Sequence, residues 1–78
     1  MSDKEREQIV SSLELYRKMR DDYGETLKML EAKIPDYRYG DQGMYRTLQS
    51  EYNDVAFALH KICGYIEAYE EQLASIAQ

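Results

Sequence analysis

The sequence lacks the disulfides, signal sequence and membrane-spanning segment that are typical of small exported or membrane-anchored domains. It holds a single cysteine, so no disulfide can form within the chain, and a lone thiol fits a reducing cytoplasm. Its first residues, Met-Ser-Asp-Lys-Glu-Arg-Glu, lack the apolar stretch of a secretory signal. The longest unbroken apolar run, from Val55 to Leu59, is far too short to span a membrane. We therefore expect a cytoplasmic protein that does not bind membranes.

Positive charge is also scarce. The 78 residues carry 10 Lys and Arg against 15 Asp and Glu, which gives a net charge of −5. Residues 34–78 hold only three basic side chains against seven acidic ones. Direct binding to nucleic acid or to anionic lipid needs clustered Lys and Arg. We expect neither, whereas a partner with a basic surface would be tolerated.

Catalytic and metal-binding motifs are missing as well. The sequence has no nucleophile triad, no glycine-rich phosphate loop and no paired-carboxylate site. His60 and Cys63 lie three residues apart on a predicted helix, but a zinc site needs four ligands. We interpret them as a surface histidine and a partly buried thiol, and we expect no metal, no cofactor and no enzymatic activity.

What the sequence does contain is a strong helical period. Ten uncharged positions step forward by three and four residues along the second half of the chain, which predicts a packed helix. These positions are Tyr45, Leu48, Tyr52, Val55, Leu59, Ile62, Ile66, Tyr69, Leu73 and Ile76. The first half repeats the same spacing at Ile9, Leu13, Tyr16, Arg20, Tyr23, Leu27, Leu30 and Ile34.

The predicted fold is all-α, an antiparallel hairpin of two long helices in one domain, residues 1–78. The first helix covers about 3–34 and runs through Gly24, because the apolar spacing continues past that glycine. Pro35 disfavours helical geometry at Ile34, so we expect the helix to end there. A loop covers about 35–41, and Asp41 is the best N-cap for a second helix over about 42–77.

One hairpin cannot cover its own apolar stripe, because positions beside the stripe are partly apolar too. We therefore predict that the hairpin dimerises into a four-helix bundle. The candidate dimer core consists of Leu59, Ile62, Ile66, Tyr69, Leu73 and Ile76.

Arg20 is the one charged residue on either stripe. Its stem could pack while its head reaches water or pairs with an acid such as Glu51 or Asp54. Alternatively it fixes the register and oligomeric state. A third interpretation makes it the anion-binding group of a small active site.

Two surfaces are candidates for binding a protein partner. The first is the loop tip, Tyr37, Arg38 and Tyr39, because Tyr and Arg are enriched in interface hot spots; the alternative is that the rings only cap the end of the bundle. The second lies opposite the stripe of the second helix and consists of Phe57, Lys61, Gly64 and Tyr65. Isolated exposed apolar residues are common, and the alternative is that this face is ordinary surface.

The sequence thus favours a non-enzymatic interaction module, such as an adaptor, chaperone or regulator, that acts as a small homodimeric bundle. The alternative is a small acidic inhibitor of a nucleic-acid-processing enzyme, of the anti-restriction or anti-CRISPR kind that phages and mobile elements encode. Clusters of acids, around Asp21 and Asp22 and around Glu70 and Glu71, motivate that alternative. A small all-α enzyme that uses Arg20 comes third.

Overall fold

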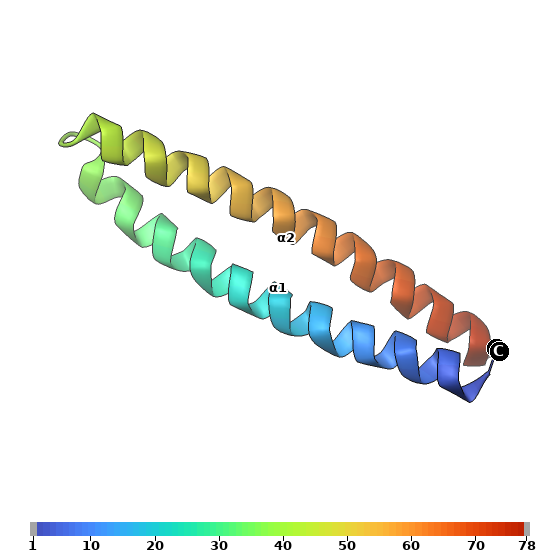
Figure 1. Ribbon diagram of the computed structural model, residues 1–78. Coiled ribbons are helices and arrows are strands. Elements are labelled where there is room, and N and C mark those ends of the chain that lie inside the picture. Colours follow the sequence, from blue (N-terminus) through green and yellow to red (C-terminus); the bar gives the residue numbers. More distant parts are fainter. Residues whose placement is uncertain (1, 78) are drawn as a thin grey trace.

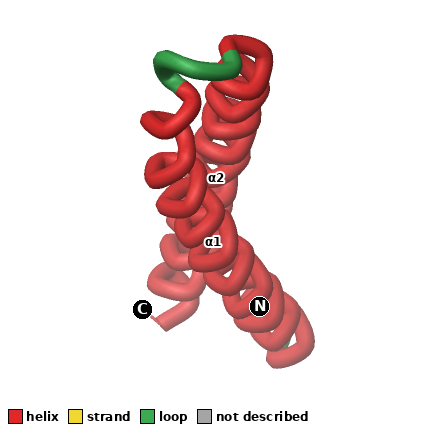
Figure 2. Tube along the Cα trace, turned by 90° about the vertical axis from the view of Figure 1, so that its left-hand side faces the viewer, coloured by secondary structure: helices red, strands yellow, loops and turns green. Residues whose placement is uncertain are grey.

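The computed structural model is a hairpin of two long antiparallel helices (Figure 1). Helix α1 spans Asp3–Tyr37 and helix α2 spans Gln42–Ala77. The structure describes the backbone of residues 2–77 and the side chains of residues 2–76, so Met1 and Gln78 of the predicted domain lie outside it. The molecule is a rod of 57 × 15 × 14 Å. The connecting loop forms one end and both termini lie at the other (Figure 2). The predicted all-α hairpin is confirmed.

Both helices begin at a polar side chain that satisfies a free backbone amide. The Asp41 carboxylate accepts a hydrogen bond of 3.1 Å from the amide of Met44, which confirms Asp41 as the N-cap of α2. At the start of α1, the Ser2 hydroxyl accepts from the amide of Glu5 at 3.2 Å. Ser2 and Glu5 have the Ser-x-x-Glu spacing of a capping box. Each helix start is therefore encoded locally.

The predicted stop at Pro35 is wrong. Helix α1 continues for three more residues to Tyr37, and the real connection is the short segment 38–41. Proline lacks an amide hydrogen, so it removes one bond of the helical ladder, but near a helix end that loss is small. Beyond it the chain tightens into a final turn. The amide of Arg38 donates to the carbonyl of Pro35 at 3.3 Å. The amide of Gly40 donates to the carbonyl of Tyr37, also at 3.3 Å.

Gly24 does not interrupt α1, as the continuous spacing predicted. A Cβ atom built at this glycine would meet no other atom within 4 Å. The backbone there is ordinary helix, because no residue described has a positive φ angle. Gly24 is therefore a weak point in the helix with no evident packing role.

The core lies along the seam between the helices. Its buried side chains are Ile9, Leu13, Leu30, Leu48, Ile62 and Ile66. Four of them, Ile9, Leu13, Ile62 and Ile66, form one cluster in the half of the rod that carries the termini. All ten stripe positions of α2 are buried or half-buried, which confirms the helical phase. The core is thin, however, because even Leu59 at the centre of the stripe is only half-buried.

Neither helix of the hairpin is apolar over a long enough stretch to cross a membrane, judged over the residues that the structure describes.

Candidate functional site

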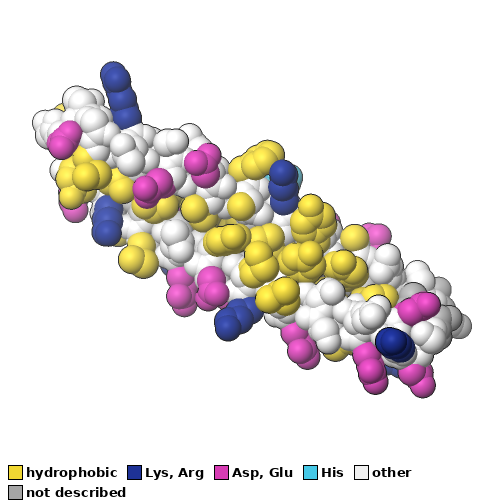
Figure 3. Space-filling view, in the orientation of Figure 1, with side chains coloured by type: hydrophobic (Ala, Val, Ile, Leu, Met, Phe, Trp, Pro, Cys, Tyr) yellow, Lys and Arg dark blue, Asp and Glu magenta, His cyan; other side chains and the backbone are white. Residues whose placement is uncertain are grey.

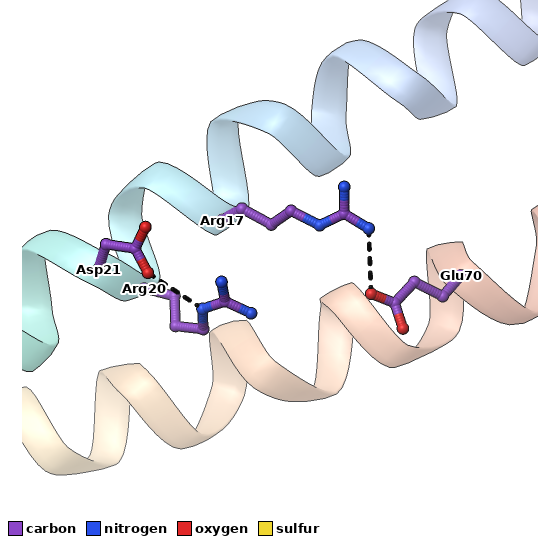
Figure 4. A network of polar contacts seen from close by, with 4 residues as sticks. All are labelled: Arg17, Arg20, Asp21 and Glu70. Carbon is purple, nitrogen blue, oxygen red and sulfur yellow. Dashed lines mark hydrogen bonds and ion pairs between the residues drawn. The ribbon is translucent and has the colours of Figure 1, made fainter.

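The two long edges of the seam differ in chemistry, and this difference defines the candidate site. The residues just beside the apolar stripe of a helix form its two flanks. In an antiparallel pair, each flank of α1 lies across the seam from one flank of α2. On one flank, Arg17 reaches across from α1 to Glu70 of α2, with 3.1 Å between Nη2 and Oε1 (Figure 4). On the same flank the Tyr52 hydroxyl donates to the Glu31 carboxylate at 3.0 Å. We call Arg17, Glu31, Tyr52 and Glu70 the polar face.

The hydrogen bond between Tyr52 and Glu31 changes how the tyrosine titrates. The bond to the carboxylate, followed by the carboxylate's negative charge, raises the pKa of Tyr52 above its usual value of 10.0. Both effects favour the protonated phenol, because a phenolate would lose the bond and repel the acid. At neutral pH the link between α1 and α2 is therefore intact.

Arg20 lies on the stripe near this polar face, and its predicted partners are wrong. Its Nε donates to Oδ1 of the adjacent Asp21 at 3.4 Å, rather than to Glu51 or Asp54 (Figure 4). The Arg20 side chain keeps 43 % of its surface exposed. The guanidinium is thus solvated, as the snorkelling interpretation requires.

The opposite flank of the seam is apolar. Tyr16 of α1 meets Tyr65 of α2 there, with ring centroids 5.5 Å apart, and also stacks on Tyr69 at 5.9 Å. Leu15 is exposed and Met19 half-buried on the neighbouring turns of α1. We call this surface the apolar face; it comprises Leu15, Tyr16, Met19, Ala58 and Tyr65. Figure 3 shows hydrophobic side chains gathered into such a band along the seam, bordered by charged side chains.

Of the four predicted binding residues of α2, Tyr65 belongs to the apolar face, and the other three share the exposed outer side of the helix. Phe57 is 62 % exposed, and the Lys61 ammonium sits 4.7 Å from the centroid of its ring. Tyr65 is 51 % exposed although it touches Tyr16. At Gly64 an added Cβ would meet nothing within 4 Å, so the glycine leaves open space on this side. The structure therefore links Tyr65 to the seam, whereas Phe57, Lys61 and Gly64 remain on the exposed outer side of α2.

The loop tip is split between helix and loop. Tyr37 is the last residue of α1 and is half-buried, so it belongs to the hairpin's own packing. Tyr39 is 90 % exposed, and the Arg38 guanidinium carbon lies 5.7 Å from the centroid of its ring. Only Arg38 and Tyr39 thus project from the tip as a pair.

The candidate dimer core contains some residues that one hairpin buries and others that it leaves half-buried. Ile62 and Ile66 are buried within the single hairpin, where they contact Ile9 and Leu13. Leu59 is half-buried, as are Tyr69, Leu73 and Ile76, which pack at the edge of that cluster. Near the termini, a groove of about 350 Å³ is lined by Arg6, Val10, Leu73, Ala74 and Ile76.

Sequence reasoning missed two features of these faces. It did not pair Arg17 with Glu70, although matching flanks of two antiparallel stripes place them together. It also left out Met19, which lies beside the stripe on the flank of Tyr65 and Ala58.

His60 is exposed and Cys63 half-buried. Within residues 2–77, no three His, Cys, Asp or Glu side chains gather as metal ligands would.

Comparison with known proteins adds no functional lead: no protein family, curated protein or solved structure gives a match to this chain.

Proposed function

We propose that this chain is a non-enzymatic protein-binding module that works as a homodimeric helical bundle, in the manner of an adaptor, chaperone or regulator. One observation carries the proposal: seven large hydrophobic side chains among the described residues are exposed in the single hairpin. They are Val10, Leu15, Met29, Tyr39, Met44, Phe57 and Tyr65. Single exposed apolar residues are common. Here, however, Leu15 and Tyr65 share one face, where burial against protein would be favourable.

The thin core supports self-association. A chain of this size is marginally stable even with a complete core. Only six hydrophobic side chains among the described residues are buried, and the middle of the seam around Leu59 and Val55 is half-exposed. A second hairpin packed on the apolar face would cover that region. The bundle would then have the core that one hairpin lacks.

The loop tip supports a separate contact with a partner. Tyr39 and Arg38 project from the end of the rod and contribute little to the seam. Tyrosine and arginine are the residues that most often dominate binding energy in interfaces. A tip that presents both, on a rigid pair of helices, suits recognition of a protein surface.

The test has two parts, both on the full chain. Sedimentation at micromolar concentration should give twice the chain mass. Proteins captured from the native host's lysate should then bind more weakly, by about 1 kcal/mol or more, to Arg38→Ala and to Tyr39→Ala. Lys18→Ala, which removes an exposed side chain far from the tip, serves as the matched control. A chain that stays monomeric and keeps full affinity in both tip variants would contradict the proposal.

An acidic inhibitor of a nucleic-acid enzyme is the second candidate. Its support is the row of exposed acids on α1, Glu14, Asp22 and Glu25. Exposed Lys18 and Lys28 interrupt that row, which makes it a poor copy of a phosphate backbone. Salt distinguishes the two functions. Binding through acidic mimicry should weaken steeply as salt rises, whereas binding through Tyr39 should change little.

A further inference from the structure

We infer that a second copy of this chain covers the apolar face with both connecting loops at the same end of the bundle; this inference rests on the homodimer of the proposed function. Two hairpins stacked face to face about a two-fold axis have two choices. With the axis along the rod, the loops lie together and α1 of each copy faces α2 of the other. With the axis across the rod, the loops lie at opposite ends and each helix faces its own counterpart.

A stable dimer would use most of one side of the hairpin. That side measures 57 by 15 Å, and each partner buries roughly 800 Å² in a standard interface. The apolar face occupies the middle of that side. The opposite side carries the Arg17–Glu70 ion pair and the Tyr52–Glu31 hydrogen bond, whose burial would cost desolvation.

Contacts within one hairpin show which residues lie at the same level along the rod. Tyr16 meets Tyr65 at 5.5 Å between ring centroids. One helical turn closer to the loop are Met19 on α1 and Lys61 on α2, so Lys61 is level with Met19. Asp22 follows one turn later on the same flank of α1. When α2 of one copy faces α1 of the other, the flexible Lys61 ammonium can therefore reach Asp22 of the second copy.

A second pair of opposite charges follows from the same reasoning. The hydrogen bond between Tyr52 and Glu31 fixes the level nearer the loop. Glu51 is next to Tyr52 in sequence, and Lys33 is two residues from Glu31, so these two charges also lie at about one level. Both project on the flank of the apolar face and both are exposed. In one hairpin Glu51 and Lys33 lie across the seam from each other without forming an ion pair, and in the same-end arrangement Glu51 of each copy also faces Lys33 of the other.

None of these four charges forms an ion pair within the part of the hairpin that the structure describes, although the Lys61 ammonium lies over the Phe57 ring. The ion pairs among residues 2–77 are Arg17–Glu70 and Arg20–Asp21. In the opposite-end arrangement, α2 of each copy faces α2 of the other, so Lys61, which is near the middle of α2, would meet Lys61 of the second copy. Like charges in an interface disfavour that orientation. Charge complementarity therefore favours the arrangement with both loops at one end.

The distance between the two loops tests this orientation directly. A spin label at Gly40→Cys, in a chain whose own thiol is removed by Cys63→Ser, reports the separation of the loops in the dimer. Gly40 suits a label because an added Cβ meets nothing within 4 Å. Packed helix axes are 8–10 Å apart, so the same-end dimer should give a distance below about 30 Å. The opposite-end dimer should give a distance near the rod length of 57 Å.

Charge reversal tests the pairing. Lys61→Glu and Asp22→Lys should each weaken dimerisation about five- to tenfold, and the double variant should return to within about threefold of the original Kd. Lys28→Glu, an exposed lysine on the polar side of α1, should leave the Kd unchanged. A dimer with distant loops, or a double variant that is not rescued, would overturn the inference while leaving the homodimer standing. A monomer at every concentration would overturn the homodimer itself.

Discussion

The polar face and the apolar face of the hairpin use opposite means to join the same two helices. On the polar face, Arg17 binds Glu70 at 3.1 Å and Tyr52 binds Glu31 at 3.0 Å. On the apolar face, Tyr16 and Tyr65 meet ring to ring and no ion pair crosses the seam among the residues that the structure describes. Exposed ion pairs contribute only about 0.2–1 kcal/mol each. The polar face therefore contributes little stability, and its directional contacts favour one alignment of the two helices.

The apolar face has a different use. Its side chains gain little within one hairpin, since Leu15 and Tyr65 remain more than half exposed. They would gain more by being buried against another protein surface. A hairpin with two polar faces would be a self-sufficient monomer, and one with two apolar faces would aggregate. One face of each kind suits a limited, specific assembly.

The largest expected effect comes from truncating a buried side chain in the seam between the two helices. Leu13 is 2 % exposed, the lowest value among the buried residues. Leu13→Ala should lower the free energy of unfolding by about 2–5 kcal/mol, measured by urea denaturation followed by circular dichroism. Val10→Ala, one turn away and exposed, is the matched control and should cost well under half as much. Equal losses in the two variants would mean that the seam is not the core.

The two mid-helix glycines sharpen the comparison, because they lie on different sides. An alanine at either position meets no neighbouring atom, so Gly24→Ala and Gly64→Ala should each raise the melting temperature. The gain should be about 0.5–1 kcal/mol, because alanine loses less backbone entropy in a helix. Gly64 borders the apolar face, so only its variant should also alter dimerisation, measured by sedimentation. An equal change in both would remove the distinction between the faces.

The ion pair of the polar face should have a smaller effect. A double-mutant cycle with Arg17→Ala and Glu70→Ala should give a coupling energy of about 0.2–1 kcal/mol. Raising the salt concentration should reduce the coupling, because both side chains are about half exposed. Coupling above about 2 kcal/mol would show that the polar face stabilises the fold instead of only aligning it.

The smallest effect concerns Tyr52 and alkaline pH. Because Glu31 raises its pKa, the stabilisation from this bond is fully present below about pH 10, the usual pKa of an unfolded tyrosine. It is lost as the pH rises through the higher pKa of the folded state. In an ultraviolet titration, Tyr52→Phe should therefore remove a late-titrating phenol. If the absorbance lost in this variant belongs to an ordinary tyrosine that titrates near pH 10, the bond to Glu31 is not formed in solution.

Much of the fold followed from spacing alone. Positions three and four residues apart predicted both stripes and their helical phase, and the Asp41 cap predicted where α2 begins. The stop at Pro35 failed because the preference of the residue before a proline is local and weak, and a helix near its end loses only one bond there. Propensity rules place such boundaries poorly for this reason.

The candidate site was harder to predict because it depends on pairing between helices. Phe57 and Tyr65 stood out in the sequence as apolar residues beside or behind the stripe. The contact of Tyr65 with Tyr16 needs the register between α1 and α2, whereas Phe57 contacts only Lys61 of its own helix among the ring contacts of the described residues. The partner of Arg20 could not be predicted either. Helical spacing fixes where Cα atoms lie, but a long side chain chooses among several rotamers, and this one turns toward Asp21.

The position of the buried cluster has a consequence for how the chain folds. Ile9, Leu13, Ile62 and Ile66 lie far from the loop, and the nearby Arg17 and Glu70 are 53 residues apart in sequence. Contacts beside the loop, such as those around Leu30 and Leu48, close a much shorter segment and cost less chain entropy. The helices should therefore zip together from the loop toward the termini, and the best-packed part of the molecule is the last to form.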